Sequence, residues 1–343
     1  MRGEERRITS EGRRAADRRK GPPPWLRIAI LIVTLAVAAY VVQHAEPPAW
    51  AIEQGGPLAT YARRLAEVMR SEARPDDALA ALFKPLQPPL KLSYSAIYEY
   101  ELCPRCYYLR RILHFPEPEG TPQVIGTAAH AALAAFYKRL RSAEADGLPP
   151  PTVDDLLTLG REEFLRQLPI RAEADPEQLR QLDAQLRLTH GRLIRPGDEV
   201  EQLEHPINFG YSRDGHTHSF HAKIDRIDRL PTGGHRIVDY KTGRPKKSLL
   251  EPDKNDLQFG IYAIALRHHQ NGLEGEPDPL DPPLGTAEYW LLATGERGTI
   301  DLADLDYEKL KSRIDGVIDG LLAGDFQREA RGCWGLCEVV VGR

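Results

Sequence analysis

The feature that most constrains the fold is a change of hydrophobic period near residue 203. Residues 203–241 alternate apolar and polar side chains with a period of two, which is typical of strands. Asp214-Gly215 and Gly233-Gly234 interrupt this region, and such dipeptides form the tight turns of hairpins. The sequence therefore predicts three consecutive strands joined by tight turns, at residues 203–211, 217–230 and 235–241.

Segments with a helical period lie on both sides of these strands. Ser93 or Ser95 is a suitable N-cap for the first of them. Charged residues at 28% and apolar residues at 41% fit a globular chain and exclude a disordered one. Together the elements predict an α/β fold with a mixed sheet flanked by helices. The expected elements are helices at 96–100, 126–140, 153–168, 176–193, 256–268 and 307–322, and a further strand at 286–293.

An uncharged apolar run from Ile28 to Val42 follows a basic segment near the start of the chain. Trp25 and Leu26 extend this run to roughly 18 residues, at the short end of the roughly 17–25 residues that a membrane-spanning helix needs. We therefore predict a basic tail at 1–24, a single-pass transmembrane helix at 25–43, and a Pro- and Ala-rich connector with a short helix at 44–90. A cleaved signal peptide and an appendage unrelated to function are the alternatives.

Charged side chains converge at the ends of two predicted strands. Alternation places Asp239 and Lys241 on one face of the strand at 235–241, with Val238 and Tyr240 on the other. The Gly-Gly turn folds the preceding strand, which carries Asp225, back beside this one. Two carboxylates and an ammonium group then lie together, and the carboxylates suit Mg²⁺ or Mn²⁺. Such a cation polarises a phosphodiester and lowers the pKa of bound water. The alternative is the solvated end of a sheet, where Asp and Lys are common.

Four separated segments carry a resemblance to a known family. They are Leu92-Ser93-Tyr94-Ser95 leading to Tyr100 and Cys103-Pro104, then Gly126-Thr127-Ala128-Ala129-His130, then Ile224-Asp225-Arg226-Ile227-Asp228 followed by Val238-Asp239-Tyr240-Lys241-Thr242-Gly243, and finally Gln258 with Tyr262. In this order they resemble the RecB-like nuclease domain of the PD-(D/E)XK nuclease superfamily, which occurs in bacterial recombination helicase–nucleases. The resemblance covers residues 91–343 and implies a PD-(D/E)XK (restriction-endonuclease-like) core. One departure is Ala222, where a Gly usually precedes the first acid.

The resemblance implies catalytic roles for the residues on the strands. Asp225 and Asp239 would bind the metal together with the backbone carbonyl of Tyr240, and Lys241 would be the catalytic lysine. Asp228 is not expected at the site, because it lies three residues beyond Asp225 and points to the opposite face.

The resemblance also implies roles for three residues on helices. His130 would be an added metal ligand of this branch, and Gln258 and Tyr262 would line the site and hold the DNA backbone. Without the resemblance, a histidine on an Ala-rich helix is more often a packed core residue. Likewise, Gln258 and Tyr262 would belong to an ordinary amphipathic helix.

The four cysteines form two close pairs, Cys103/Cys106 and Cys333/Cys337. They are too few for a disulfide-dense secreted scaffold, but four thiolates suffice for a [4Fe–4S] cluster or for zinc. Many members of the family join the two ends of the domain with an iron–sulfur cluster, using one cysteine from the opening helix and three near the C-terminus. The resemblance therefore favours iron–sulfur, although the arrangement here is two plus two. Four unrelated thiols are the alternative.

The expected function is metal-dependent hydrolysis of DNA in repair or recombination. The sequence contains no Gly-x-x-x-x-Gly-Lys-Ser/Thr motif, so a helicase partner would be a separate chain. The alternatives are an exonuclease of the CRISPR-adaptation type and a non-catalytic, membrane-tethered DNA-binding module. The formal net charge of −4 means that DNA contact needs a local basic groove. The candidates for it are Arg105, Arg110, Arg111, Arg244, Lys246 and Lys247.

This function conflicts with the predicted anchor. The positive-inside rule would keep residues 1–24 in the cytoplasm and export the chain that follows the apolar run. A DNA-processing enzyme is expected to act in the cytoplasm. The sequence leaves this conflict open.

Overall fold

The computed structural model describes residues 48–53, 59, 63, 83–114, 121–168, 173–195, 197–270, 285–327 and 331–332. The chain divides into two compact units, Met1–Lys84 and Pro85–Arg343. In the first unit the described residues include the short helix α3 (Ala49–Glu53). The predicted basic tail and transmembrane helix lie outside the described residues. Within the described part of the chain, no helix has the length and apolar character needed to cross a bilayer.

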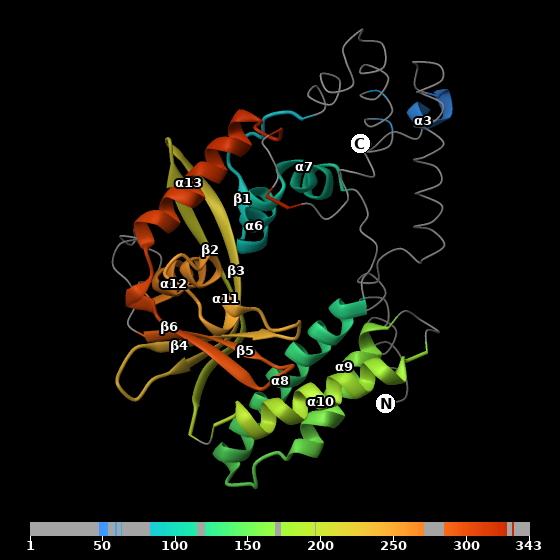
Figure 1. The fold of residues 1–343 in the computed structure, drawn as a ribbon, viewed down its shortest axis with the longest axis vertical. Helices are drawn as coiled ribbons and strands as arrows, with labels where there is room; N and C mark the ends of the chain where they lie inside the picture. Colours follow the sequence, from blue (N-terminus) through green and yellow to red (C-terminus); the bar gives the residue numbers. More distant parts are fainter. Residues whose placement is uncertain are drawn as a thin grey trace, which may run out of the picture. The chain divides into compact units, whose positions relative to one another are not determined.

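A mixed sheet forms the centre of the second unit (Figure 1). Six strands of it lie in the described residues, in the order β1-β3-β4-β5-β6, with β2 also paired to β3. The β1/β3 and β4/β5 pairs are parallel, and the other pairs are antiparallel, so the predicted mixed sheet is confirmed. The strands are β1 (Lys91–Leu92), β2 (Glu199–Arg213), β3 (His216–Arg229), β4 (His235–Lys241), β5 (Gly285–Leu291) and β6 (Glu296–Asp301).

Both predicted turns are present. Asp214 and Gly215 join β2 to β3 with φ angles of 49° and 77°, the positive values that a two-residue type I′ turn requires. Gly233 and Gly234 turn the chain between β3 and β4 with φ angles of 85° and 81°. The bounds of β4 are those predicted, whereas β2 begins at Glu199 rather than at residue 203. Strands β1 and β6 were not predicted from the sequence.

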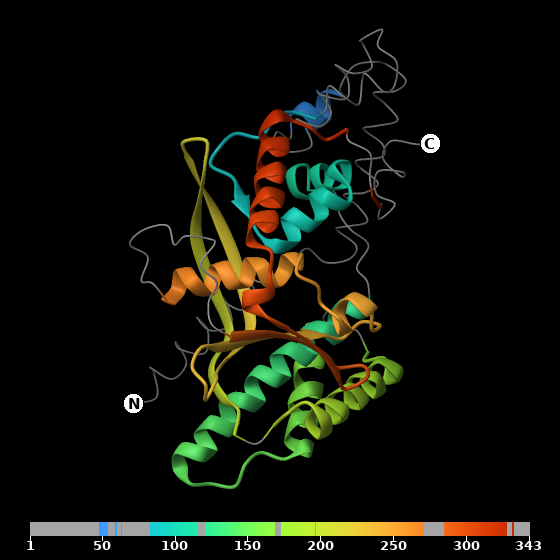
Figure 2. The same ribbon diagram turned by 60° about the vertical axis from the view of Figure 1, so that its left-hand side comes forward.

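Helices cover both faces of this sheet (Figures 1 and 2). On one face, α8 (Thr121–Asp146), α9 (Val153–Gln167) and α10 (Pro176–Arg192) enclose a hydrophobic core with Val238, Tyr240 and Trp290. On the opposite face lies α12 (Leu257–Gln270), where Phe259 stacks on Tyr289 with ring centroids 4.0 Å apart. Two further helices, α6 (Tyr94–Leu102) and α13 (Tyr307–Ala323), pack beside α12. The short elements are α7 (Pro104–Tyr107), the π-helical turn η1 (Tyr108–Ile112), α11 (Lys247–Leu250) and the 3₁₀ turn η2 (Leu302–Asp304).

The ends of several helices follow from their capping residues. Ser93 accepts a hydrogen bond from the Ala96 N–H and caps α6, as predicted. Thr152 and Asp155 form a reciprocal capping box at the start of α9. Gly324 ends α13 with a φ of 75°, a left-handed conformation that glycine adopts without steric cost.

A network of ion pairs joins β3 and β4 to Asp198, the residue just before β2. Arg226 is fully buried against the Tyr137 ring, and its guanidinium group donates to Asp228 and Asp198 at 2.5 and 2.7 Å. Arg236 on β4 also donates to both aspartates. Asp228 therefore belongs to this network, in agreement with its exclusion from the predicted site.

Candidate active site

The site lies where β3 and β4 separate. The two strands pair as far as Arg226 and Val238, so Asp225 and Asp239 are the first residues of each strand beyond the ladder. Asp225 Oδ2 accepts a hydrogen bond from the Tyr240 backbone N–H at 2.8 Å. The Asp225 carboxylate thereby satisfies the buried N–H of Tyr240, which the backbone of β3 no longer pairs once the two strands separate. The predicted acids thus lie together at a fork in the sheet.

His130 reaches this fork from α8. Its Nδ1 lies 3.1 Å from Asp225 Oδ1, and its Nε2 lies 3.0 Å from the Tyr240 carbonyl oxygen. Both partners are acceptors, so a protonated imidazole donates to each. Burial by itself would lower the pKa of His130, but the hydrogen bond and the negative charge of Asp225 raise the pKa above its usual value.

Gly126, one helical turn before His130, allows α8 to lie close to the end of β4. A Cβ atom at Gly126 would lie 3.2 Å from Thr242 Oγ1, just beyond the end of β4. That separation is tighter than ordinary van der Waals contact, which needs about 3.5–4.0 Å. The Gly-x-x-x-His spacing therefore has a geometric basis. Gly126 allows α8 to lie close to the end of β4, and His130, one turn later, then reaches Asp225.

A second cluster joins β4 to α12. The Lys241 ammonium lies 2.7 Å from Asp239 Oδ2 and donates to Gln258 Oε1 at 2.8 Å. Gln258 Nε2 in turn donates to Asp239 Oδ1 at 2.6 Å, and the Tyr262 hydroxyl donates to the same oxygen at 3.3 Å. Burial raises the pKa of Asp239 above its usual value, although Lys241 opposes this. Gln258 and Tyr262 thus lie beside Asp239, and their expected role in holding the DNA backbone stays a prediction.

Two residues of this cluster were not predicted from the sequence. Asp256 accepts from the Phe259 N–H at 2.9 Å at the start of α12 and from the Tyr289 hydroxyl at 3.0 Å. Burial raises the pKa of the Asp256 carboxyl. The Lys241 ammonium lies 5.1 Å from the centre of the Tyr289 ring, within cation–π distance. A helix N-cap was the available signal for Asp256, whereas the position of Tyr289 depends on the pairing of β5 with β4.

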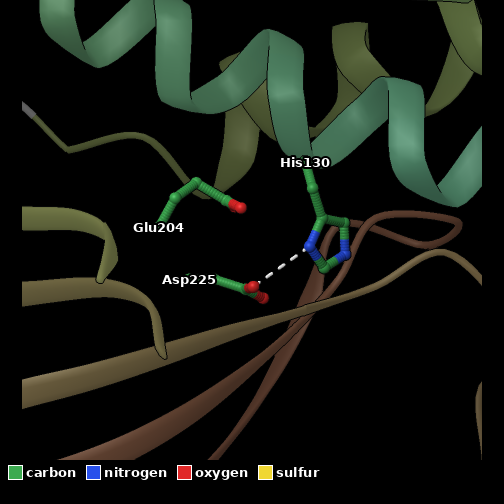
Figure 3. A group of neighbouring side chains, drawn as sticks. All are labelled: His130, Glu204 and Asp225. Atoms are coloured by element: carbon green, nitrogen blue, oxygen red, sulfur yellow. Dashed lines mark hydrogen bonds and ion pairs between the residues drawn. The ribbon is translucent and has the colours of Figure 1, made fainter. Parts of the chain in front are cut away.

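Glu204, on β2, was likewise not predicted. Leu203 pairs with Arg226 and His205 with Ile224, which places Glu204 opposite Asp225. One ligand atom from each of His130, Glu204 and Asp225 lies within 4.8 Å of the other two (Figure 3). One Glu204 carboxylate oxygen pairs with the Lys223 ammonium. The other, Oε1, is buried and has no hydrogen-bond partner.

The donors at the fork fit a divalent cation. Carboxylate oxygens and a backbone carbonyl are ligands that Mg²⁺ and Mn²⁺ prefer, and Mn²⁺, a transition metal, also accepts an imidazole nitrogen. A buried carboxylate oxygen without a partner is costly, and a bound cation would satisfy it. The unpartnered Oε1 of Glu204 therefore supports a cation at this place.

The cysteine pairs are only half described. Cys103 and Cys106 are buried at the start of α7, where the Cys106 N–H donates to Cys103 Sγ at 3.4 Å. Cys333 and Cys337 lie outside the described residues, so the shared iron–sulfur or zinc centre stays a prediction. Two backbone N–H groups just before Cys333, those of Arg331 and Gly332, donate to the Leu102 carbonyl at 2.9 and 3.2 Å. The chain neighbours of Cys103 and Cys333 are thus hydrogen-bonded to each other.

Five of the six predicted basic residues fall into two groups, and the sixth, Arg105, is half-buried on α7. Arg244, Lys246 and Lys247 are exposed on the segment that leaves the end of β4 beyond Lys241. Arg110 and Arg111 instead pair with the buried Glu99, at 3.5 and 2.7 Å.

Comparisons with known proteins agree with the motifs. The family model described as the PD-(D/E)XK nuclease superfamily matches residues 91–340, which include every element of the site. An ATP-dependent helicase/deoxyribonuclease from Carboxydothermus hydrogenoformans has a subunit that is 31% identical over 201 residues, covering 50% of this chain. The chain spans only 18% of the length of that relative. The solved structure described as "Crystal structure of SSO0001" aligns over 71% of this chain and 93% of its own, with a TM-score of 0.30 and 15% identity. The chain belongs to the PD-(D/E)XK nuclease superfamily.

Proposed function

We propose that this chain is a divalent-metal-dependent deoxyribonuclease that hydrolyses phosphodiester bonds in DNA with Mg²⁺ or Mn²⁺. The observation that carries this proposal is the meeting of Asp225, Asp239 and Lys241 at the fork between β3 and β4, beside His130. Membership of the nuclease superfamily supports phosphodiester hydrolysis as the reaction.

The side chains have separate tasks in this reaction. A cation held by Asp225, Asp239, His130 and the Tyr240 carbonyl would polarise the phosphodiester and lower the pKa of a water molecule. Lys241 is held in place by its contacts with Asp239 and Gln258. Its ammonium has three N–H groups, so one stays available to orient the attacking water or to offset charge on the phosphate.

Two features support DNA as the substrate. The exposed basic segment at Arg244, Lys246 and Lys247 begins within three residues of Lys241, where a phosphate backbone could follow it. The name of the bacterial relative contains both helicase and deoxyribonuclease. We extend from it a role in repair or recombination, with a separate helicase chain as partner.

The test is degradation of labelled linear DNA by the full chain with Mg²⁺. Asp239→Asn and Lys241→Met should each lower the rate at least about 100-fold, because each removes charge used at the transition state. Lys311→Met, an exposed position on α13, is the control and should keep the wild-type rate. Equal rates in the Asp239→Asn variant and the wild type would overturn the proposal.

A second arm of the experiment separates two modes of action. Substrates with blocked ends and with open ends are compared, because an exonuclease needs a free end. DNA binding without cleavage on either substrate would favour the non-catalytic module instead.

A further inference from the structure

Glu204 is a carboxylate at the site to which the proposed reaction gives no task. Its side chain is 22% exposed, and the Lys223 side chain with which it pairs is 53% exposed. Its backbone has a φ of 50°, which is uncommon for a residue other than glycine. This conformation and the position opposite Asp225 direct the carboxylate to the His130 side of the fork (Figure 3).

The distances suit direct ligation of one ion. Bonds to a small divalent cation measure about 2.0–2.4 Å, so any two ligands of one cation lie at most about 4.8 Å apart. Atoms of His130, Glu204 and Asp225 meet this limit in every pairing. Oε1 of Glu204 is also the buried oxygen that has no other partner.

We propose that Glu204 is a further ligand of the cation, and that Lys223 is a counter-ion from which Glu204 is released when the cation binds. The inference rests on the cation site of the proposed function and adds one residue and one competitor to it. Lys223 is the more exposed partner, so its ammonium returns to water at little cost. Glu204 stays at the fork, where the doubly charged cation replaces the singly charged Lys223 ammonium as the partner of its carboxylate.

The experiment measures Mn²⁺ binding to the full chain, by the electron paramagnetic resonance signal of free Mn²⁺, without DNA. Glu204→Gln should weaken binding about tenfold or more, because a charged ligand is lost. Lys223→Gln should tighten binding several-fold, because the competitor is lost. With both changes, the tightening should disappear and the affinity should equal that of Glu204→Gln alone.

Two controls guard the interpretation. Glu199→Gln removes an exposed carboxylate from the same strand, one that pairs with Arg229 at 3.7 Å, and should leave Mn²⁺ affinity unchanged. Glu204→Asn is a second variant, because Asn tolerates a positive φ better than most residues and so guards against misfolding. It should weaken binding as Glu204→Gln does.

Each contrary result has a distinct meaning. If both Glu204 variants bind Mn²⁺ as tightly as the wild type, Glu204 is only the partner of Lys223 in a surface ion pair, and the inference is overturned. An unchanged affinity in Lys223→Gln would overturn the competition. A wild-type chain whose Mn²⁺ binding depends on Glu204 but which cuts no DNA would contradict the proposed function and leave this inference standing.

Discussion

At the residue scale, Gln258 is the side chain that contacts both charged groups at the end of β4, those of Asp239 and Lys241. Its amide donates to Asp239 and to the Tyr262 hydroxyl, and its carbonyl accepts from Lys241. An amide suits this task because it carries a donor and an acceptor on one rigid plane. A carboxylate at this position would have no donor for Asp239 and would repel it.

We predict that Gln258→Ala lowers the rate of DNA cleavage about 10–100-fold, the range found when partners behind metal ligands are removed. Asp239 and Lys241 would lose their common partner, and Asp239 would keep only Lys241 and the more distant Tyr262 hydroxyl. The measurement is kcat on linear DNA, with circular dichroism to show that the fold is kept. Tyr262→Phe removes one weaker hydrogen bond to Asp239 and should cost less. A larger loss in Tyr262→Phe than in Gln258→Ala would contradict this assignment.

At the element scale, the distance between α8 and the end of β4 decides whether His130 can reach the fork. The helix packs through the fully buried Ala128, Ala129 and Ala132, whose short side chains allow a close approach. Gly126 extends this contact to Thr242.

We predict that Gly126→Ala weakens Mn²⁺ binding several-fold, because the added methyl group displaces α8 and with it His130. Thr242→Ala removes the Oγ1 atom that the methyl group would meet, so the double variant should regain most of the affinity. Mn²⁺ titration of the three variants measures this coupling. Additive losses in the double variant would show that the contact between Gly126 and Thr242 is not the cause.

At the scale of the whole molecule, the ion-pair network that joins β3 and β4 to Asp198 makes stability depend on pH. Burial by itself would raise the pKa of Asp198, but the neighbouring Arg226 and Arg236 guanidinium groups hold it below its usual value. A carboxyl whose pKa is lower in the folded state stabilises the fold above its unfolded pKa of about 3.9. This contribution is lost as the pH falls through the lower, folded value.

We predict that Asp198→Asn lowers the free energy of unfolding by about 1.5–3 kcal/mol at pH 7, the range for hydrogen bonds to charged groups. The difference from the wild type should shrink as the pH falls below about 4. Urea unfolding at a series of pH values measures it. The exposed Asp304→Asn should match the wild type throughout. A difference that stays constant into acid would contradict the ionic origin.

Local signals explain which parts of this fold were predictable. The strands around the two turns were found because Asp214-Gly215 and Gly233-Gly234 mark them within a few residues. The residues that meet at the fork on β3, β4 and α8 were identified from motifs that resemble those of the nuclease family, and His130 would not have been identified by helical period alone. β6 was missed because its six residues give too short an alternation. The π-helical turn η1 was missed because its geometry has no sequence period of its own.

Tertiary pairing explains what the sequence could not provide at the site. Glu204 has no motif around it, and its place depends on a positive φ and on the register between β2 and β3. Tyr289 reaches Lys241 only because β5 pairs in parallel with β4, opposite Asp239. Both relations join segments far apart in the chain.

The fork has a mechanical consequence. His130 belongs to the helical layer on one face of the sheet, and Gln258 belongs to the helix on the other, with β4 between them. A cation bound at the fork by His130 and Asp239 would connect both helical layers to β4, directly through His130 and indirectly through the contact of Gln258 with Asp239. Occupancy and resistance to unfolding are then thermodynamically linked, and a force that slides one layer against the other would also eject the ion.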